Sequence, residues 1–194
     1  MKNLSNSPLI IVLFMLLSYN ANSQSVQNQG TMFMPLPFGI GFGYELGIGN
    51  QLSLNLTGEF RAYIGDDDFA ADNIVMSPRI GLEGKYYYNL KKRFDAGKNT
   101  DNNSANYFAI LISEEFPFGY GAIRDYPQYT TRINAKWGMK RTLSQNFTID
   151  FGIYAGTKYG GKLQEYGNST GYRSYGDNEW MADYGIYVTL SHIF

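Results

Sequence analysis

Cysteine is missing from the 194-residue chain, and histidine occurs only once, at His192. Without a thiol, the chain forms no disulfide and carries no lipoprotein anchor, and one imidazole excludes a metal site built from several histidines. An excess of one charge is missing too, because 16 basic residues are balanced by 17 acidic ones. This balance leaves no basic surface for nucleic acid. We therefore predict no cofactor, no metal and no nucleic-acid partner.

Long apolar runs are scarce, and the longest lies near the N-terminus at residues 9–17. It follows a lysine and precedes the small residues Ala21 and Ser23, which is the arrangement of a secretory signal peptide. The alternative, a membrane-anchoring helix, needs roughly 20 apolar residues. We predict that residues 1–23 are a cleaved signal peptide and that residues 24–194 form one exported domain.

Glycine and aromatic residues are abundant, with 22 Gly, 17 Tyr and 13 Phe. In PFGIGFGYELGIGN, residues 37–50, bulky apolar residues occupy the even positions and glycine most of the odd ones. A period of two is that of a β-strand, and no window shows a helical stripe longer than two turns. The alternation predicts seven strands, at residues 38–48, 52–64, 76–88, 107–115, 129–140, 147–159 and 182–194.

The two faces of these segments differ in charge. The positions assigned to the apolar face hold no Asp, Glu, Lys or Arg, whereas the opposite face carries six acids and seven bases. Isolated buried charges would be strongly desolvated, but acids and bases in similar number can pair with one another. We predict a structural charge network made of Glu45, Glu59, Arg61, Arg79, Glu83, Lys85, Glu115, Arg132, Lys136, Lys140, Asp150, Lys158 and Asp183.

Alternation alone leaves two architectures open. A soluble periplasmic barrel or sandwich turns its apolar face inward, whereas an outer-membrane barrel turns it to lipid and encloses the charges. Export, aromatic residues at strand ends, and strand lengths near the roughly 9 to 11 residues that cross a bilayer favour the membrane barrel. The glycines then leave room for long side chains in a narrow lumen, although they also permit tight coiling of the sheet.

Strand number follows from the orientation of the last strand. If that strand runs down to the periplasm, the first predicted strand does so too, and an ascending strand must precede it. Barrels of this kind have even strand numbers, and residues 25–35 are the remaining candidates. The sequence therefore predicts an all-β, eight-stranded antiparallel up-and-down transmembrane β-barrel. Its outer loops are 65–75, 117–127 and 160–181, and its periplasmic connections are 49–51, 89–106 and 141–146.

The chain ends in DYGIYVTLSHIF, with apolar or aromatic residues at alternate positions. This end resembles the C-terminal strand that the barrel assembly machinery of Gram-negative bacteria recognises. The Tyr-rich and Gly-rich hairpins resemble small barrels of the OmpX and OmpA membrane-domain kind, and KYYYNLKKRFDAGKNTDNNSANYF is similar to barrel proteins of Bacteroidetes. The resemblance implies an integral outer-membrane protein in contact with lipid and lipopolysaccharide. The implied assembly signal is Tyr184, Ile186, Val188, Leu190 and Phe194.

Two candidates for chemistry stand out. Some small outer-membrane lipid A deacylases carry a Ser–His dyad on the outer wall, so Ser191 and His192 must be considered. Adjacent strand residues point to opposite faces, however, and a dyad needs one face; we prefer an interfacial aromatic role for His192. The acidic run 66–68 with Asp72 offers oxygen ligands for calcium but lacks the EF-hand spacing, which favours a solvated loop.

Two further segments are candidates for contacts. Tyr166, Tyr172, Tyr175 and Trp180 lie in the predicted loop 160–181, where they would bind sugars or proteins or pack as a rim. Leu90 to Asp95, LKKRFD, would form one amphipathic turn that presents Lys91, Lys92 and Arg93 to lipid phosphates or a periplasmic partner.

Together these features predict a barrel with a plugged, salt-bridged lumen and a structural, surface-interaction or complex-accessory role. We expect no enzymatic activity. The alternatives are a lipid-modifying enzyme of the deacylase kind and a narrow pore.

Overall fold

The computed structural model describes residues 26–35, 39–64, 74–116, 118–119, 129–165 and 173–194. The predicted signal peptide, residues 1–23, lies outside this set. The strands are β1 (Gln29–Pro35), β2 (Gly39–Gly47), β3 (Leu52–Ile64), β4 (Ile74–Tyr86), β5 (Asn106–Glu115), β6 (Phe118–Gly119), β7 (Thr130–Ser144), β8 (Phe147–Glu165) and β9 (Arg173–Ile193). A short helix, α2 (Leu90–Asp95), and a 3₁₀ turn, η2 (Asp101–Asn103), connect β4 to β5.

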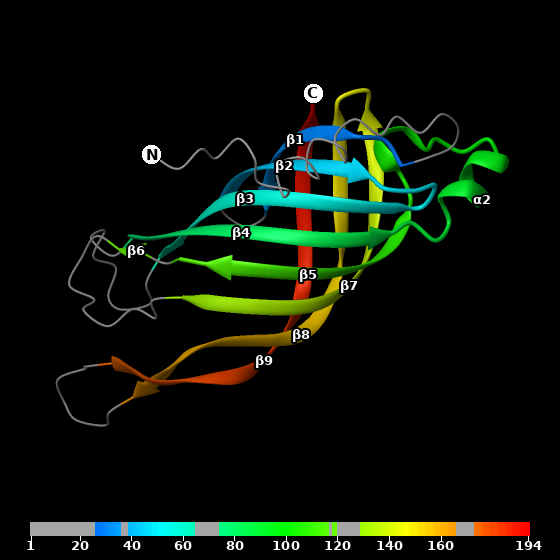
Figure 1. Cartoon of the computed structure of the whole chain (residues 1–194). Coiled ribbons are helices and arrows are strands. Elements are labelled where there is room, and N and C mark those ends of the chain that lie inside the picture. Colours follow the sequence, from blue (N-terminus) through cyan, green and yellow to red (C-terminus); the bar gives the residue numbers. More distant parts are fainter. Residues whose placement is uncertain (1–25, 36–38, 65–73, 117, 120–128, 166–172) are drawn as a thin grey trace, which may run out of the picture.

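The strands form a closed antiparallel barrel (Figure 1). Their order is β3-β2-β1-β9-β8-β7-β5-β4, and the pairing of β3 with β4 closes the cylinder. The two-residue β6 pairs with β4 beyond the end of β5, so β5 and β6 occupy one position in the wall. The predicted eight-stranded antiparallel barrel is therefore confirmed. The predicted additional strand within residues 25–35 is β1, which pairs with β2 and β9.

The apolar side of the alternation lies on the outer wall. Phe42 and Leu56 are 58% and 61% exposed, whereas Glu45 and Glu83 on the other side are 2% and 4% exposed. Residues paired across neighbouring strands lie on the same face of the sheet, so the outer surface is apolar and the inner surface polar from strand to strand. The soluble alternative requires an apolar interior, whereas the interior of this barrel contains buried charged side chains.

Two charged residues break the pattern of the outer wall. Glu114 is paired with Ile80 and Thr131 and accepts a hydrogen bond of 2.6 Å from Thr131 Oγ1. Arg141 is paired with Ile149 and donates to Asn106 Oδ1. Glu114 lies in the predicted strand 107–115, where the expectation of an uncharged outer face is wrong. Arg141 lies in the predicted connection 141–146, which is too long because β7 continues to Ser144. Both lie near strand ends, where polar neighbours supply hydrogen bonds.

The wall is uneven in height. β1 and β2 have 7 and 9 residues, whereas β8 and β9 have 19 and 21. The loop predicted at 160–181 is therefore too long, because strand pairing continues to Glu165 and resumes at Arg173. Tyr175 and Trp180 belong to β9 rather than to a loop, and Tyr166 and Tyr172 lie outside the described residues.

The predicted amphipathic turn is α2, at the barrel end where both β1 begins and β9 ends. The guanidinium of Arg93 is bonded within the chain, since it donates to the carbonyls of Ser104 and Asn99 at 2.8 and 2.9 Å. Lys91 pairs with Asp95 at 2.8 Å, and Lys92 is exposed. None of the described helices is long and apolar enough to cross a bilayer.

Candidate functional site: the barrel lumen

The lumen is filled at the end that carries α2, which we call the closed end. Tyr87 and Tyr107 are fully buried there and meet edge to face, with ring centroids 5.4 Å apart. Val26 packs in the same cluster. Asn103 ties down the preceding chain, since it accepts from Gln27 N at 2.7 Å and donates to Gln27 O at 3.0 Å. The segment before β1 and the connection after β4 thus close the barrel together.

Glu45 receives hydrogen bonds from several buried donors of the lumen. It accepts hydrogen bonds from Tyr87 Oη and Ser53 Oγ, both at 2.6 Å, and from Gln29 Nε2 at 2.7 Å. Lys140 Nζ lies 3.2 Å from Oε2 of Glu45, the oxygen that Gln29 also contacts. Charge-assisted bonds from several donors are what a buried carboxylate needs to stay ionised.

Of the remaining acids near the closed end, Glu83 pairs with lysines, whereas Asp150 is bonded to a tyrosine hydroxyl and forms no ion pair among the described residues. Glu83 lies 2.6 Å from Lys136 Nζ and 3.4 Å from Lys85 Nζ. Asp150 accepts from Tyr107 Oη at 2.8 Å. Three acids thus accompany three lysines. This lysine network consists of Glu45, Glu83, Asp150, Lys85, Lys136 and Lys140.

A second group of ion pairs lies towards the opposite end of the strands. Glu59 contacts Arg61 and Arg79 at 3.0 and 3.1 Å. Glu115 contacts Arg79 at 2.7 Å and also pairs with Arg132. Arg132 continues the chain of contacts to Asp183. This arginine network consists of Glu59, Glu115, Asp183, Arg61, Arg79 and Arg132.

The two networks contain twelve of the thirteen predicted lumen charges. The thirteenth, Lys158, is paired in register with Arg132 and forms no ion pair among the described residues. Each network is balanced by itself, with three acids and three bases. The sequence predicted the set of charges but not this division into a lysine part and an arginine part.

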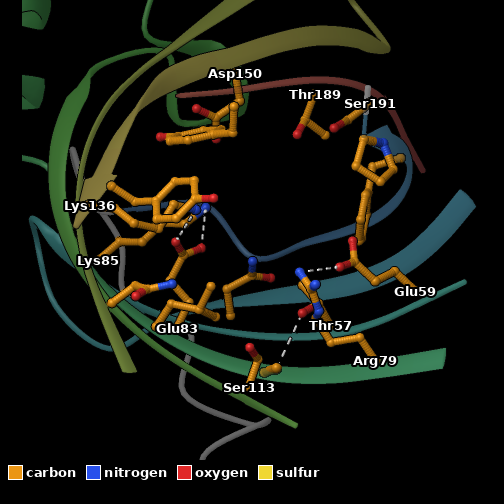
Figure 2. A pocket seen from close by; sticks show the side chains of 18 of the residues that line it. Thr57, Glu59, Arg79, Glu83, Lys85, Ser113, Lys136, Asp150, Thr189 and Ser191 are labelled. Carbon is orange, nitrogen blue, oxygen red and sulfur yellow. Dashed lines mark hydrogen bonds and ion pairs between the residues drawn. The ribbon is translucent and has the colours of Figure 1, made fainter. Parts of the chain in front are cut away.

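A cavity of about 330 Å³ lies among these groups. Figure 2 shows Glu83 with Lys85 and Lys136 on one side of it and Glu59 with Arg79 on another. Two buried polar atoms in its lining, Ser113 Oγ and Asn134 Oδ1, have no hydrogen-bond partner within the described part of the chain. Sequence reasoning missed both residues, since neither carries a charge.

Glycines make room for the lumen side chains. A Cβ on Gly138 or Gly152 would collide with the hydroxyl of Tyr187, whereas a Cβ on Gly58 or Gly84, on the outer wall, would meet nothing within 4 Å. The predicted spatial role of glycine therefore applies to positions that point inward. The outer-wall glycines need another explanation, such as coiling of the sheet.

Ser191 and His192 lie on opposite faces of β9. Ser191 is buried and lines the cavity, while the His192 ring packs against Phe147 on the outer wall, with centroids 5.0 Å apart. These two residues therefore cannot act as a dyad. Among the described residues no group of three or more potential ligands could hold a metal ion; the acidic run 66–68 with Asp72 lies outside them.

The residues of the expected assembly signal lie on the last strand, except Phe194, which follows it directly. Tyr184, Ile186 and Phe194 are prominently exposed on the outer wall. The terminal segment closes the barrel, because Thr189 to Ile193 pair with β1 and Phe194 N donates to Gly30 O at 3.2 Å. No protein-family model, no curated protein and no solved structure matches this chain. The barrel geometry therefore carries the functional argument alone.

Proposed function

We propose that the chain is an integral outer-membrane β-barrel protein with a lumen closed to free flow, acting as a structural, surface-interaction or complex-accessory protein and not as an enzyme. The observation that carries this proposal is the distribution of polarity, with an apolar outer wall around a charged and polar interior. Lipid tolerates such a wall, and the enclosed charges satisfy one another. In water the same wall would be a large exposed apolar surface, which soluble monomers avoid.

Aromatic pairs at both ends of the outer wall support the same conclusion. At the closed end Trp137 donates to Tyr88 Oη at 3.1 Å. At the other end Tyr159 and Trp180 contact each other, with centroids 5.2 Å apart. Amphipathic rings at two levels match the aromatic girdles of membrane barrels. The proposed partners are outer-membrane lipid and lipopolysaccharide, the barrel assembly machinery during insertion, and a further outer-membrane or periplasmic protein.

Cell fractionation tests the location. We expect the full chain, expressed in a Gram-negative host, to sediment with the outer membrane, to resist extraction by alkaline carbonate and to dissolve in mild detergent. Lipid A from these cells should keep its mass, and should do so equally with Ser191→Ala. A chain that dissolves in the periplasm as a monomer without detergent would overturn the proposal, and altered lipid A would favour the enzyme.

Planar-bilayer conductance tests the closed lumen. We expect no steady ion current for the native chain, because Tyr87, Tyr107 and the lysine network fill one end. Replacing both tyrosines, Tyr87→Ala with Tyr107→Ala, should produce a current. The control Glu59→Ala with Arg79→Ala enlarges the cavity above the filled end and should not. A steady current through the native chain would instead identify a narrow pore.

A further inference from the structure

The low side of the barrel wall is too short to cover the hydrocarbon of a membrane. At about 3.3 Å per residue and a tilt of about 45°, the seven residues of β1 rise by about 16 Å. The apolar band of an outer-membrane barrel is about 25 Å tall. In the membrane orientation proposed above, on which this inference rests, β1 therefore ends within the hydrocarbon region.

The neighbouring strand leaves a free edge at the same place. β9 pairs with β1 only over Thr189 to Ile193, and among the described residues Arg173 to Val188 pair with β8 alone. Ile186 on this stretch is 80% exposed, as expected for an edge residue without a neighbour on one side. Among the described residues the wall thus has a gap above Pro35, between β1 and β9.

The cavity reaches this gap. Its lining includes Phe33 and Pro35 of β1 and Ile186 and Val188 of β9. Ile186 belongs to the outer-wall alternation, so it can line an internal cavity only where that cavity passes the edge of the strand. The lumen consequently opens sideways, and the opening is apolar.

The interior behind the opening has a different chemistry. The buried Ser113 Oγ and Asn134 Oδ1 line it without hydrogen-bond partners among the described residues. The cavity lining carries five carboxylates and six basic side chains, so its charges nearly cancel and give an ionic ligand little advantage. A neutral or zwitterionic group that hydrogen-bonds would fit, and 330 Å³ lies at the lower end of the roughly 300 to 1,000 Å³ of ligand sites.

We propose that the cavity binds the neutral or zwitterionic head of a single-chain amphiphile that enters from the membrane through the gap between β1 and β9. The acyl chain of the amphiphile lies in the gap against Phe33, Pro35, Ile186 and Val188. Its head replaces the missing partners of Ser113 and Asn134.

Tryptophan quenching tests the proposal in nanodiscs made of phosphatidylcholine. In a Trp137→Phe, Trp180→Phe background, Phe33→Trp places a reporter in the cavity and Met32→Trp places one on the outer wall. Bromine-labelled lysophosphatidylcholine should quench the reporter at position 33 saturably, at one molecule per barrel, and unlabelled lysophosphatidylcholine should reverse it. Pro35→Trp serves as the reporter if Phe33→Trp does not fold.

A pair of hydroxyl deletions provides a matched control. Ser113 Oγ and Thr148 Oγ1 are both buried and unpartnered among the described residues, but only Ser113 lines the cavity. Ser113→Ala should weaken binding of the labelled lipid about three- to tenfold, the usual value of one hydrogen bond. Thr148→Val should leave the affinity unchanged. Equal affinities of the two variants for the labelled lipid would contradict the proposed contact with Ser113.

The two reporters separate the possible failures. If brominated two-chain phosphatidylcholine does not quench Met32→Trp, the outer wall does not contact lipid and the proposed function is wrong. If it quenches Met32→Trp while neither cavity reporter shows saturable quenching, only the amphiphile site is wrong. A dimer in native mass spectrometry together with unsaturable quenching would assign the free edge of β9 to a second copy and overturn the proposal.

Discussion

The two ion-pair networks of the lumen have the same charge balance but different surroundings. In the lysine network, Glu45 is 2% exposed and bonded to uncharged donors as well as to Lys140. In the arginine network, the side chain of Arg61 is 31% exposed. An ammonium is compact and fits a packed interior, whereas the guanidinium fork of Arg79 bridges two carboxylates beside open space. The lysine network lies towards the closed end and the arginine network towards the other end, and residues of both line the cavity.

Neutralising one acid in each network gives the largest expected difference. Glu45→Gln removes the partner of Lys140 in a dry site, so we expect a loss of about 3 to 5 kcal/mol in the free energy of unfolding. Glu59→Gln should lose less than half of that, because water in the cavity can solvate the released Arg61. Urea unfolding of the folded barrel in lipid vesicles measures both. Equal losses would show that the two networks are equally dry.

Added volume at the closed end should have an intermediate effect. Gly138→Ala introduces a methyl group where the Tyr187 and Tyr107 hydroxyls lie, so we expect a loss of about 1 to 3 kcal/mol by overpacking. Gly84→Ala adds the same group in open space on the outer wall and should be neutral or slightly stabilising. The same urea titration compares them, and a neutral Gly138→Ala would refute the close packing around Tyr187.

Loosening the cover of the closed end should have the smallest effect. Asn103→Gly keeps the left-handed backbone that Asn103 adopts, with φ of 61°, but removes its two hydrogen bonds to Gln27. We expect a loss of about 1 kcal/mol and faster proteolysis near the N-terminal segment. As a control, Asn99→Gly should change proteolysis there much less. Unchanged cleavage in Asn103→Gly would mean that other contacts hold the segment.

Much of the barrel was predictable because strand alternation is local. The side chains of Phe42 and Glu45 are assigned to opposite walls by the period of two alone, and the even strand number pointed to β1 before any pairing was known. The prediction that Trp180 lies in the loop 160–181 was wrong, because β9 already begins at Arg173. Strand ends are set by pairing partners on other strands, which alternation within one segment does not reveal.

The pairings within the lumen were less predictable. One signal was present, since the turn at 49–51 pairs Gly47 with Ser53, which puts Ser53 diagonally next to Glu45 on the same face. The contact of Glu45 with Lys140 spans 95 residues and had no such signal. Nothing in the sequence distinguished Lys158 from the charges that find partners.

The sequence by itself determined which side chains share a face of the sheet, because a period of two acts within each strand. Only the tertiary structure decided which charges pair, which end is filled and where the wall falls short. Those features depend on the register and relative length of strands far apart in the chain, and the gap between β1 and β9 exists only because the first strand and the last meet.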